Sequence, residues 1–147
     1  MLIGIPIAVI LFLLISTALA RLFSLDGAED SAITSLVKAE AAGNSAGMVA
    51  RIQGCAQSSS CRARVSYDAS HLRRSGALTI LRIDNSAGFS LSGTIGTARV
   101  AWRTGFGLPV VQCVKVHRAG SVLSGFRIEL LEVSRRITSD AVCPRHY

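Results

Sequence analysis

Several features that would point to a particular chemistry are scarce or missing from this chain. Aromatic residues are few, with one Trp, two Tyr and five Phe, so there is no stacking platform of the kind that single-strand nucleic-acid binders use, and we do not expect a nucleic-acid partner. Gly88, Gly93 and Gly96 do not complete a Gly-x-Gly-x-x-Gly dinucleotide fingerprint. No cysteines form a C-x-x-C pair and the histidines add no such spacing, which argues against zinc. We therefore expect no cofactor and no metal.

Charged side chains are absent from the first twenty residues, and residues 2–20 are mostly apolar. These nineteen residues approach the ~20 that cross a bilayer as a helix. An uncleaved anchor fits the run, with Pro6 in the first turns, where proline is tolerated. A cleaved signal peptide fits the small-x-small cleavage pattern Ala18-Leu-Ala20. Against cleavage, no Lys or Arg precedes the apolar residues, and Arg21 directly follows the expected cleavage site. A buried helix of a soluble protein fits least, because the run is apolar on every side.

We therefore expect residues 1–22 to form a membrane anchor or a signal peptide, with the membrane as partner through residues 2–20. The remaining chain is expected at the cell membrane facing outward, or secreted if the leader is cleaved.

Behind this segment the chain is basic and long enough for one domain of ordinary size. Its formal net charge is +7, and fourteen of its sixteen basic residues are Arg, scattered along the sequence. A basic surface favours anionic partners such as lipid headgroups, cell-wall polymers or nucleic acid. An arginine-rich codon bias explains the same composition without any function, and we favour that explanation.

The four cysteines are an even number in a small chain with an export signal, which predicts disulfides. Four cysteines allow three pairings. We expect Cys55–Cys61 to close a short loop and Cys113–Cys143 to tie the C-terminal tail to the domain.

Helix signals occupy the first half of the chain. Asp26–Glu29 has the form of a capping box and predicts a helix that begins there and stops at Gly43. Asn44 or Ser45 is expected to cap a second, shorter helix that ends at Gly54. A third helix ending near residue 76 is predicted by an apolar stripe comprising Cys61, Val65, Ala69 and Leu72. The alternative for residues 62–67 is a strand.

Alternating strand patterns occupy the second half. Strands are expected at residues 77–84, 94–103, 108–118 and 122–133, with a short piece at 89–91 and a tight hairpin turn at 119–121. Residues 135–147 form a polar tail. The predicted fold class is α+β, with N-terminal helices packed on a bent antiparallel sheet of three to four long strands, preceded by one apolar transmembrane or signal helix.

The helix, Gly-Asn break and second helix within Ser35–Met48, followed by the late hairpins, resemble the NTF2-like (cystatin-like, SnoaL-type) superfamily. The resemblance is topological, carries no diagnostic motif, and places an NTF2-like domain at residues 26–134. It implies a strongly bent sheet in a family of isomerases, dehydratases and non-enzymatic binding or assembly modules. Catalytic members use an Asp/His or Tyr/Asp constellation inside the cone of the sheet. No residue of this chain can be assigned to it, so no catalytic role is carried over.

The ionisable residues fit structural roles better than catalytic ones. Asp68 and His71 stand three residues apart and would share a helix face as a surface ion pair. Asp84 is expected to hydrogen-bond the backbone of a turn. Glu129 belongs to a solvated cross-strand charge pattern. The candidate acid and base groups considered are Asp68, His71, Asp84, His117, Glu129 and Glu132.

The predicted function is a non-catalytic, membrane-tethered extracytoplasmic accessory domain whose bent sheet receives a partner protein or a small apolar ligand. One alternative is a secreted cationic binder of anionic polymers or lipids, and another is a small isomerase- or dehydratase-like enzyme. A pilin-like subunit also begins with an apolar helix, but this helix lacks the glutamate near its start that such subunits typically use, so we disfavour it. The arginines considered for the cationic binder are Arg99, Arg103, Arg118, Arg127, Arg135 and Arg136.

Overall fold

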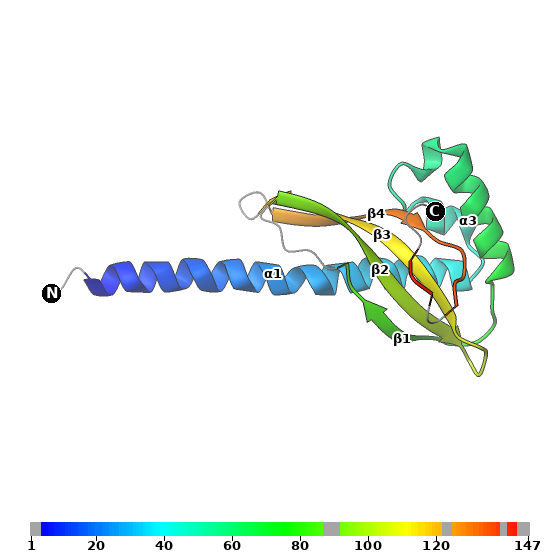
Figure 1. Ribbon diagram of the computed structural model, residues 1–147, viewed down its shortest axis with the longest axis horizontal. Helices are drawn as coiled ribbons and strands as arrows, with labels where there is room; N and C mark the ends of the chain where they lie inside the picture. The colour runs from blue at the N-terminus through cyan, green and yellow to red at the C-terminus, as the bar shows by residue number, and fades with distance from the viewer. Residues whose placement is uncertain (1–3, 87–91, 122–124, 139–140, 144–147) are drawn as a thin grey trace.

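The computed structural model describes residues 4–86, 92–121, 125–138 and 141–143. Helices come first along the chain and a four-stranded antiparallel sheet follows, which confirms the predicted α+β class (Figure 1). The elements are α1 (Gly4–Ala41), α2 (Ser45–Val49), the 3-10 helix η1 (Cys55–Gln57), α3 (Ser59–His71), β1 (Leu78–Asp84), β2 (Ser92–Thr104), β3 (Val110–Ser121) and β4 (Gly125–Val133). The short piece expected at 89–91 lies outside the described residues.

The first helix is longer than the sequence suggested. α1 is one helix of 38 residues, which corresponds to about 57 Å. The predicted helix start at Asp26 is therefore wrong, because that residue lies inside α1. Glu29 does not cap the chain; its Oε1 instead accepts a hydrogen bond from the backbone N–H of Ser86 (2.7 Å). Leu25, Glu29 and Ile33 are all buried one turn apart, and this packing holds the helix together through the region.

The two halves of α1 have different surroundings. Its C-terminal half lies against the sheet and the short helices, whereas its N-terminal half extends away from them (Figure 1). Within the described part of the chain, no helix meets the combined requirement of length and apolarity for crossing a membrane.

Side-chain caps begin both short helices, and the one at Asn44 was predicted from the sequence. The Asn44 side chain accepts a hydrogen bond from the N–H of Gly47 (2.8 Å) and begins α2, although that helix ends at Val49 rather than at Gly54. The Ser58 hydroxyl accepts from the N–H of Cys61 (3.2 Å) and begins α3. The third helix is thus confirmed over most of its expected length.

The sheet is a meander in the order β1-β2-β3-β4. The turn predicted at 119–121 is wrong, because β3 continues to Ser121 and Gly120 pairs with Phe126 of β4. Gly120 has φ of 109°, and a Cβ there would lie 2.1 Å from the carbonyl oxygen of Gly125. The hairpin therefore needs glycine inside the strand pair rather than in a turn.

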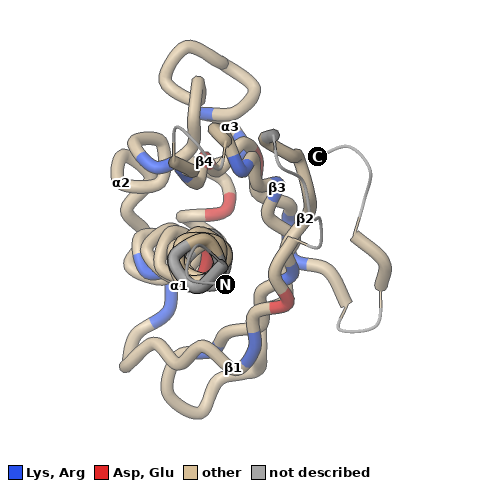
Figure 2. The backbone as a smooth tube through the Cα atoms, turned by 90° about the vertical axis from the view of Figure 1, so that its left-hand side faces the viewer, with Lys and Arg blue, Asp and Glu red and all other residues tan. Residues whose placement is uncertain are grey.

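The core fills the space between the helices and one face of the sheet, which we call the inner face. Figure 2 looks along α1 and shows β2 and β3 on one side of it and α2 on the other. Trp102 is fully buried, and α1 packs into the bend of the sheet. The inner face is therefore occupied by the chain's own helices. Its buried strand residues are Ala98, Val100, Trp102, Val110, Val114, Val116, Leu130 and Val133.

Candidate functional site

The N-terminal half of α1 carries an uncovered apolar surface. Eight side chains between Ile7 and Ile15 are 51% to 69% exposed. Because successive helical residues are rotated by about 100°, this surface surrounds the helix instead of forming one stripe. Soluble monomers rarely leave contiguous apolar surface of this kind in water. The residues are Ile7, Val9, Ile10, Leu11, Phe12, Leu13, Leu14 and Ile15.

A chain of buried polar side chains crosses the core. The indole N–H of Trp102 donates to Gln112 Oε1 (2.9 Å), and Gln112 Nε2 donates to Glu40 Oε1 (2.7 Å) and to the carbonyl of Ser134 (3.1 Å). Burial raises the pKa of Glu40 to about 8, against the opposing effect of the Gln112 hydrogen bond, and the nearby Asp68 raises it further. Glu40 therefore keeps its proton in the folded core near neutral pH.

Asp68 is the second carboxyl in this core, and its predicted place on the surface is wrong. It is 1% exposed and lies on the buried face of α3. Burial raises its pKa to about 6, opposed by the positive charges of Arg64, Arg135 and His71. His71 Nδ1 lies 2.8 Å from the carbonyl oxygen of Tyr67, and no direct bond between His71 and Asp68 is seen among the described residues.

Glu40 and Asp68 each leave one buried carboxyl oxygen without a hydrogen bond among the described residues. Neither residue lines the two depressions described below. Chemically, the pair can bind or release protons inside the core, which makes it a determinant of stability rather than a site open to a substrate.

The remaining acid and base candidates lie in surface ion pairs. Asp84 Oδ1 accepts from Arg82 Nε (2.5 Å) rather than from the backbone of a turn. Glu129 lies between Arg127 Nε (2.6 Å) and His117 Nδ1 (2.9 Å), and these two groups hold the pKa of Glu129 below its usual value. Glu132 pairs with Lys115 at 3.6 Å. The cross-strand charge pattern is confirmed, and it accounts for these residues without catalysis.

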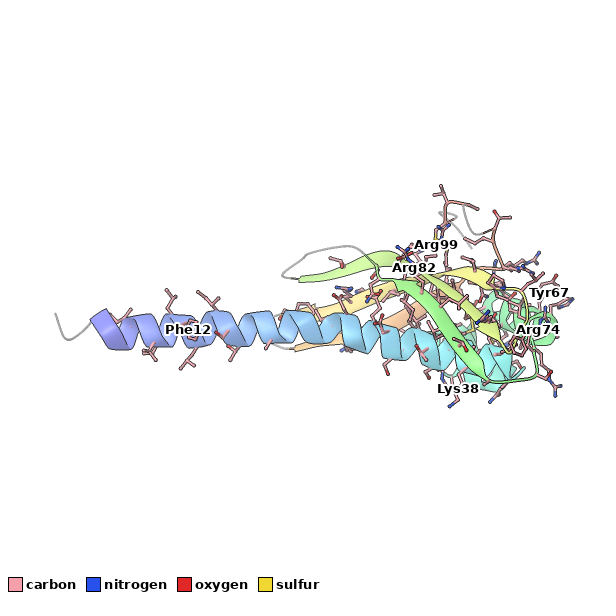
Figure 3. All side chains as sticks on the ribbon, turned by 90° about the horizontal axis from the view of Figure 1, so that it is seen from below. Phe12, Lys38, Tyr67, Arg74, Arg82 and Arg99 are labelled. Carbon is pink, nitrogen blue, oxygen red and sulfur yellow. A yellow bond between two sulfur atoms is a disulfide. The ribbon has the colours of Figure 1, made fainter. Side chains whose placement is uncertain are left out.

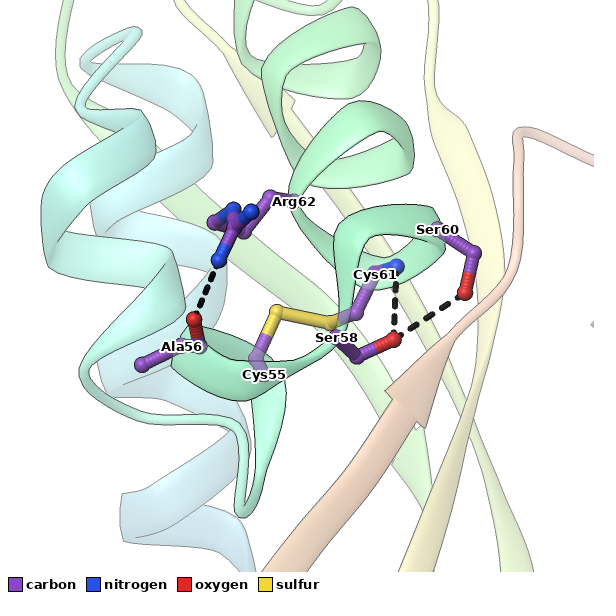
Figure 4. Close-up of a disulfide and its surroundings, with 6 residues drawn as sticks. All are labelled: Cys55, Ala56, Ser58, Ser60, Cys61 and Arg62. Atoms are coloured by element: carbon purple, nitrogen blue, oxygen red, sulfur yellow. Dashed lines mark hydrogen bonds between the residues drawn. A yellow bond between two sulfur atoms is a disulfide. The ribbon is translucent and has the colours of Figure 1, made fainter.

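Both predicted disulfides are present. Cys55–Cys61 has a Cα–Cα distance of 5.3 Å and joins η1 to α3 (Figure 4). Cys113–Cys143 has a Cα–Cα distance of 5.8 Å and ties the tail to β3. Beside the first disulfide is a depression of about 230 Å³ whose lining includes Gln53, Ser60, Arg64 and Glu132.

A more open depression of about 680 Å³ lies along the solvent side of α1, and its lining includes Ser35, Lys38 and Asn44, which belong to two serine motifs that sequence reasoning missed. Ser35-Leu-Val-Lys38 matches Ser-x-x-Lys, and Gly43-Asn-Ser-Ala-Gly47 matches Gly-x-Ser-x-Gly. Ser35 Oγ accepts from Arg51 Nε (2.5 Å), and no contact with Lys38 is seen in the described residues. The second motif joins two helices, whereas a nucleophile elbow joins a strand to a helix. Neither motif has the surroundings that would activate its serine.

The six arginines considered for a cationic surface do not act together. Arg118 is on the inner face, where its Nη2 lies 2.7 Å from Glu29 Oε2 and 2.8 Å from Asp26 Oδ1. Arg127 is paired with Glu129. Arg136 donates to the carbonyl of Pro109 (3.2 Å). Arg118 therefore lies on the opposite face of the sheet from Arg99 and Arg103, which alternate with the inner-face residues Val100 and Trp102, so the six arginines do not share one face.

No family model, curated protein or solved structure matches this chain. The resemblance to the NTF2-like superfamily therefore stays a prediction, and the function must be argued from the chain itself.

Proposed function

We propose that this protein is a non-catalytic accessory domain held at the outer side of a cell membrane by its N-terminal apolar segment. The observation that carries the proposal is the apolar surface around residues 7–15, which a bilayer would cover on all sides. The uncharged run of residues 2–20 gives the segment about the right length.

The two disulfides support an outward-facing domain. Disulfides persist in oxidising compartments and are rare in the cytosol of mesophiles. All four cysteines are paired in the structure, and both bridges belong to the part of the chain behind the apolar segment.

The outer surface of the domain is the more suitable place for a partner protein. The inner face of the sheet packs against α1, with Trp102 fully buried, so a small apolar ligand would compete with the chain's own core there. We therefore assign partner binding to surfaces outside the bend of the sheet.

Fractionation of a double variant tests the tether. Phe12→Arg/Leu14→Arg places two charges in the apolar segment, at a cost of about 2.5–3.5 kcal/mol each in a membrane helix. The matched control is Leu81→Arg/Leu108→Arg, which changes two exposed apolar residues of the domain. We expect wild type and control in the alkali-resistant membrane fraction and the test variant outside it.

Protease added to intact cells should digest the domain of the wild-type protein. Full protection of the domain, or equal membrane retention of both double variants, would contradict the proposal. Release of a shortened wild-type protein into the medium would instead indicate a cleaved leader.

A second candidate is a pilin-like subunit, whose apolar half-helices would pack together in an assembly. The specific observation that favours it is the unbroken α1, with one half free and the other half packed into the domain. The missing glutamate still counts against it. Cross-linking distinguishes the two candidates: Leu13→Cys should form disulfide-linked dimers in membranes if the helices pack, and Ser31→Cys, on the solvent side of α1, serves as the control for random collision.

A further inference from the structure

The depression beside the Cys55–Cys61 disulfide has an apolar base and a polar rim, and we call it the disulfide depression. Ile52, Val65 and Val133 line it and are no more than 3% exposed, so they lie at its base. An apolar base with a few converging polar groups is the usual composition of a site for a small molecule. The polar residues of the lining are Gln53, Ser58, Ser60, Arg64 and Glu132.

The walls of the disulfide depression are fixed to one another. The disulfide joins η1 to α3, and the Ser58 hydroxyl accepts from the N–H of Cys61 (3.2 Å) in the first turn of α3 (Figure 4). The backbone N–H of Gln53 donates to the carbonyl of Leu130 on β4 (2.7 Å), which holds the segment after α2 against the sheet. A cavity that is already formed costs a ligand little free energy of ordering.

Two residues of opposite charge line the disulfide depression without pairing with each other. Arg64 forms no ion pair or hydrogen bond within the described part of the chain, although its charge acts on the buried Asp68 one turn along α3. Glu132 lies 3.6 Å from Lys115 Nζ, which is too long for a hydrogen bond, and Lys115 is not part of the lining. Arg64 and Glu132 therefore present unused donors and unused acceptors to the same cavity.

We propose that the disulfide depression binds the zwitterion of a free amino acid with an apolar side chain. The Arg64 guanidinium can hold the α-carboxylate through two parallel hydrogen bonds, and the Glu132 carboxylate can accept from the α-ammonium group. A ligand with one charge would leave Arg64 or Glu132 without a partner. The apolar base receives the ligand's side chain, and burial of that side chain is favourable.

The size and the position of the disulfide depression agree with this occupant. Its volume of about 230 Å³ is below the ~300 Å³ at which sites for drug-sized ligands begin, which suits a single amino acid rather than a peptide or a nucleotide. Figure 3 shows Tyr67 of α3 at the opposite end of the molecule from Phe12 of the apolar segment. The depression, which α3 helps to form, therefore stays accessible when a membrane covers that segment, and binding there does not depend on the tether.

The test is an NMR titration of the isotope-labelled full chain in a non-ionic detergent, with L-leucine as the probe. Two matched ligands keep the leucine side chain and lose one charge each: isocaproate lacks the ammonium group, and isoamylamine lacks the carboxylate. We expect leucine to bind with a Kd of about 1 mM and to shift the amide resonances of Gln53, Ser60 and Leu131. Each singly charged ligand should bind at least about tenfold more weakly, because one hydrogen bond between charged groups is lost.

Two variants assign the contacts. Arg64→Gln should weaken the binding of leucine and isocaproate about tenfold and leave that of isoamylamine unchanged. Glu132→Gln should weaken leucine and isoamylamine by a similar factor and leave isocaproate unchanged. A purely structural role of either residue would instead change the affinity for all three ligands together.

The matched controls are Arg62→Gln on α3 and Glu129→Gln on β4, which remove the same charges from residues outside the lining. Arg62 donates to the carbonyl oxygen of Ala56 (Figure 4), and Glu129 is held by its cationic neighbours on the sheet. Both controls should bind leucine with about the affinity of wild type.

Isocaproate or isoamylamine binding wild type as tightly as leucine would overturn the proposal, because one charge would then be enough. Equal weakening of leucine by a control variant would also overturn it. So would the absence of shifts at the three reporter amides at about 10 mM leucine, well above the expected Kd. The affinities of wild type for the three ligands decide the question even where a variant does not fold.

Discussion

Glu40 provides a direct test of the core described above. Its pKa is about 8 in the folded protein and 4.5 in an unfolded chain, so the folded state holds a proton that the unfolded state releases. The stabilisation that Glu40 contributes is therefore fully present below pH 4.5 and is lost as the pH rises through 8. Each pH unit inside the window costs about 1.4 kcal/mol, and between pH 6 and 8 the loss is about 2 kcal/mol.

Glu40→Gln should remove that loss, because the amide resembles the protonated acid and its oxygen can still accept from Gln112. Asp68 titrates near pH 6 and contributes in the same direction below that pH, so the range from pH 6 to 8 mainly isolates Glu40. Urea unfolding of both proteins at pH 6, 7 and 8 measures the difference. We expect the variant to gain about 2 kcal/mol relative to wild type across this range. A difference independent of pH would refute the reasoning and show that Glu40 is ionised throughout.

Three further predictions concern the supports of the fold. Cys143→Ser should lower the free energy of unfolding by about 3.5 kcal/mol. The difference from wild type should disappear in reductant, because reductant also breaks the Cys113–Cys143 disulfide of the wild-type protein. Gly27→Ala should stabilise by about 0.5–1 kcal/mol in urea unfolding if α1 is continuous there, since a Cβ at this position meets nothing within 4 Å; destabilisation would indicate a break. Arg118→Ala should lower the free energy of unfolding by about 3 kcal/mol, because it leaves the buried Glu29 without its cation. Arg118→Lys should recover part of this loss. Equal stability of wild type and both variants would show that the hydrogen bonds from Ser86 are enough for the Glu29 carboxylate.

The strands were predictable because apolar residues recur at every second position, although β3 is buried on both faces over residues 110–114. Val110, Val114 and Val116 share the inner face as expected, while Cys113 and Lys115 lie on the other. The disulfides were predictable from cysteine number and spacing. The strand pattern is a local signal, and four cysteines allow only three pairings.

The long helix and the buried acids were not predictable by the same means. A capping box at Asp26–Glu29 is a local pattern, but Glu29 forms its bonds with Ser86 and Arg118, which lie far along the chain. Asp68 lies beside the predicted apolar stripe, three residues after Val65, but its place in the sequence gives no sign of the Glu40 carboxyl near it in the core. Residues whose partners are distant in sequence carry no local sign of them.

Because α1 is one helix, the apolar segment and the domain are joined without a linker. Position 20 and the buried Leu25 are five residues apart along the helix, which is about 7.5 Å of rise. In a bilayer the domain would rest close to the lipid surface and could not swing independently of its anchor. Any tilt or rotation of the membrane-embedded half would be transmitted to the sheet as a rigid-body movement, so the direction in which the sheet faces would be set by how the anchor lies in the lipid.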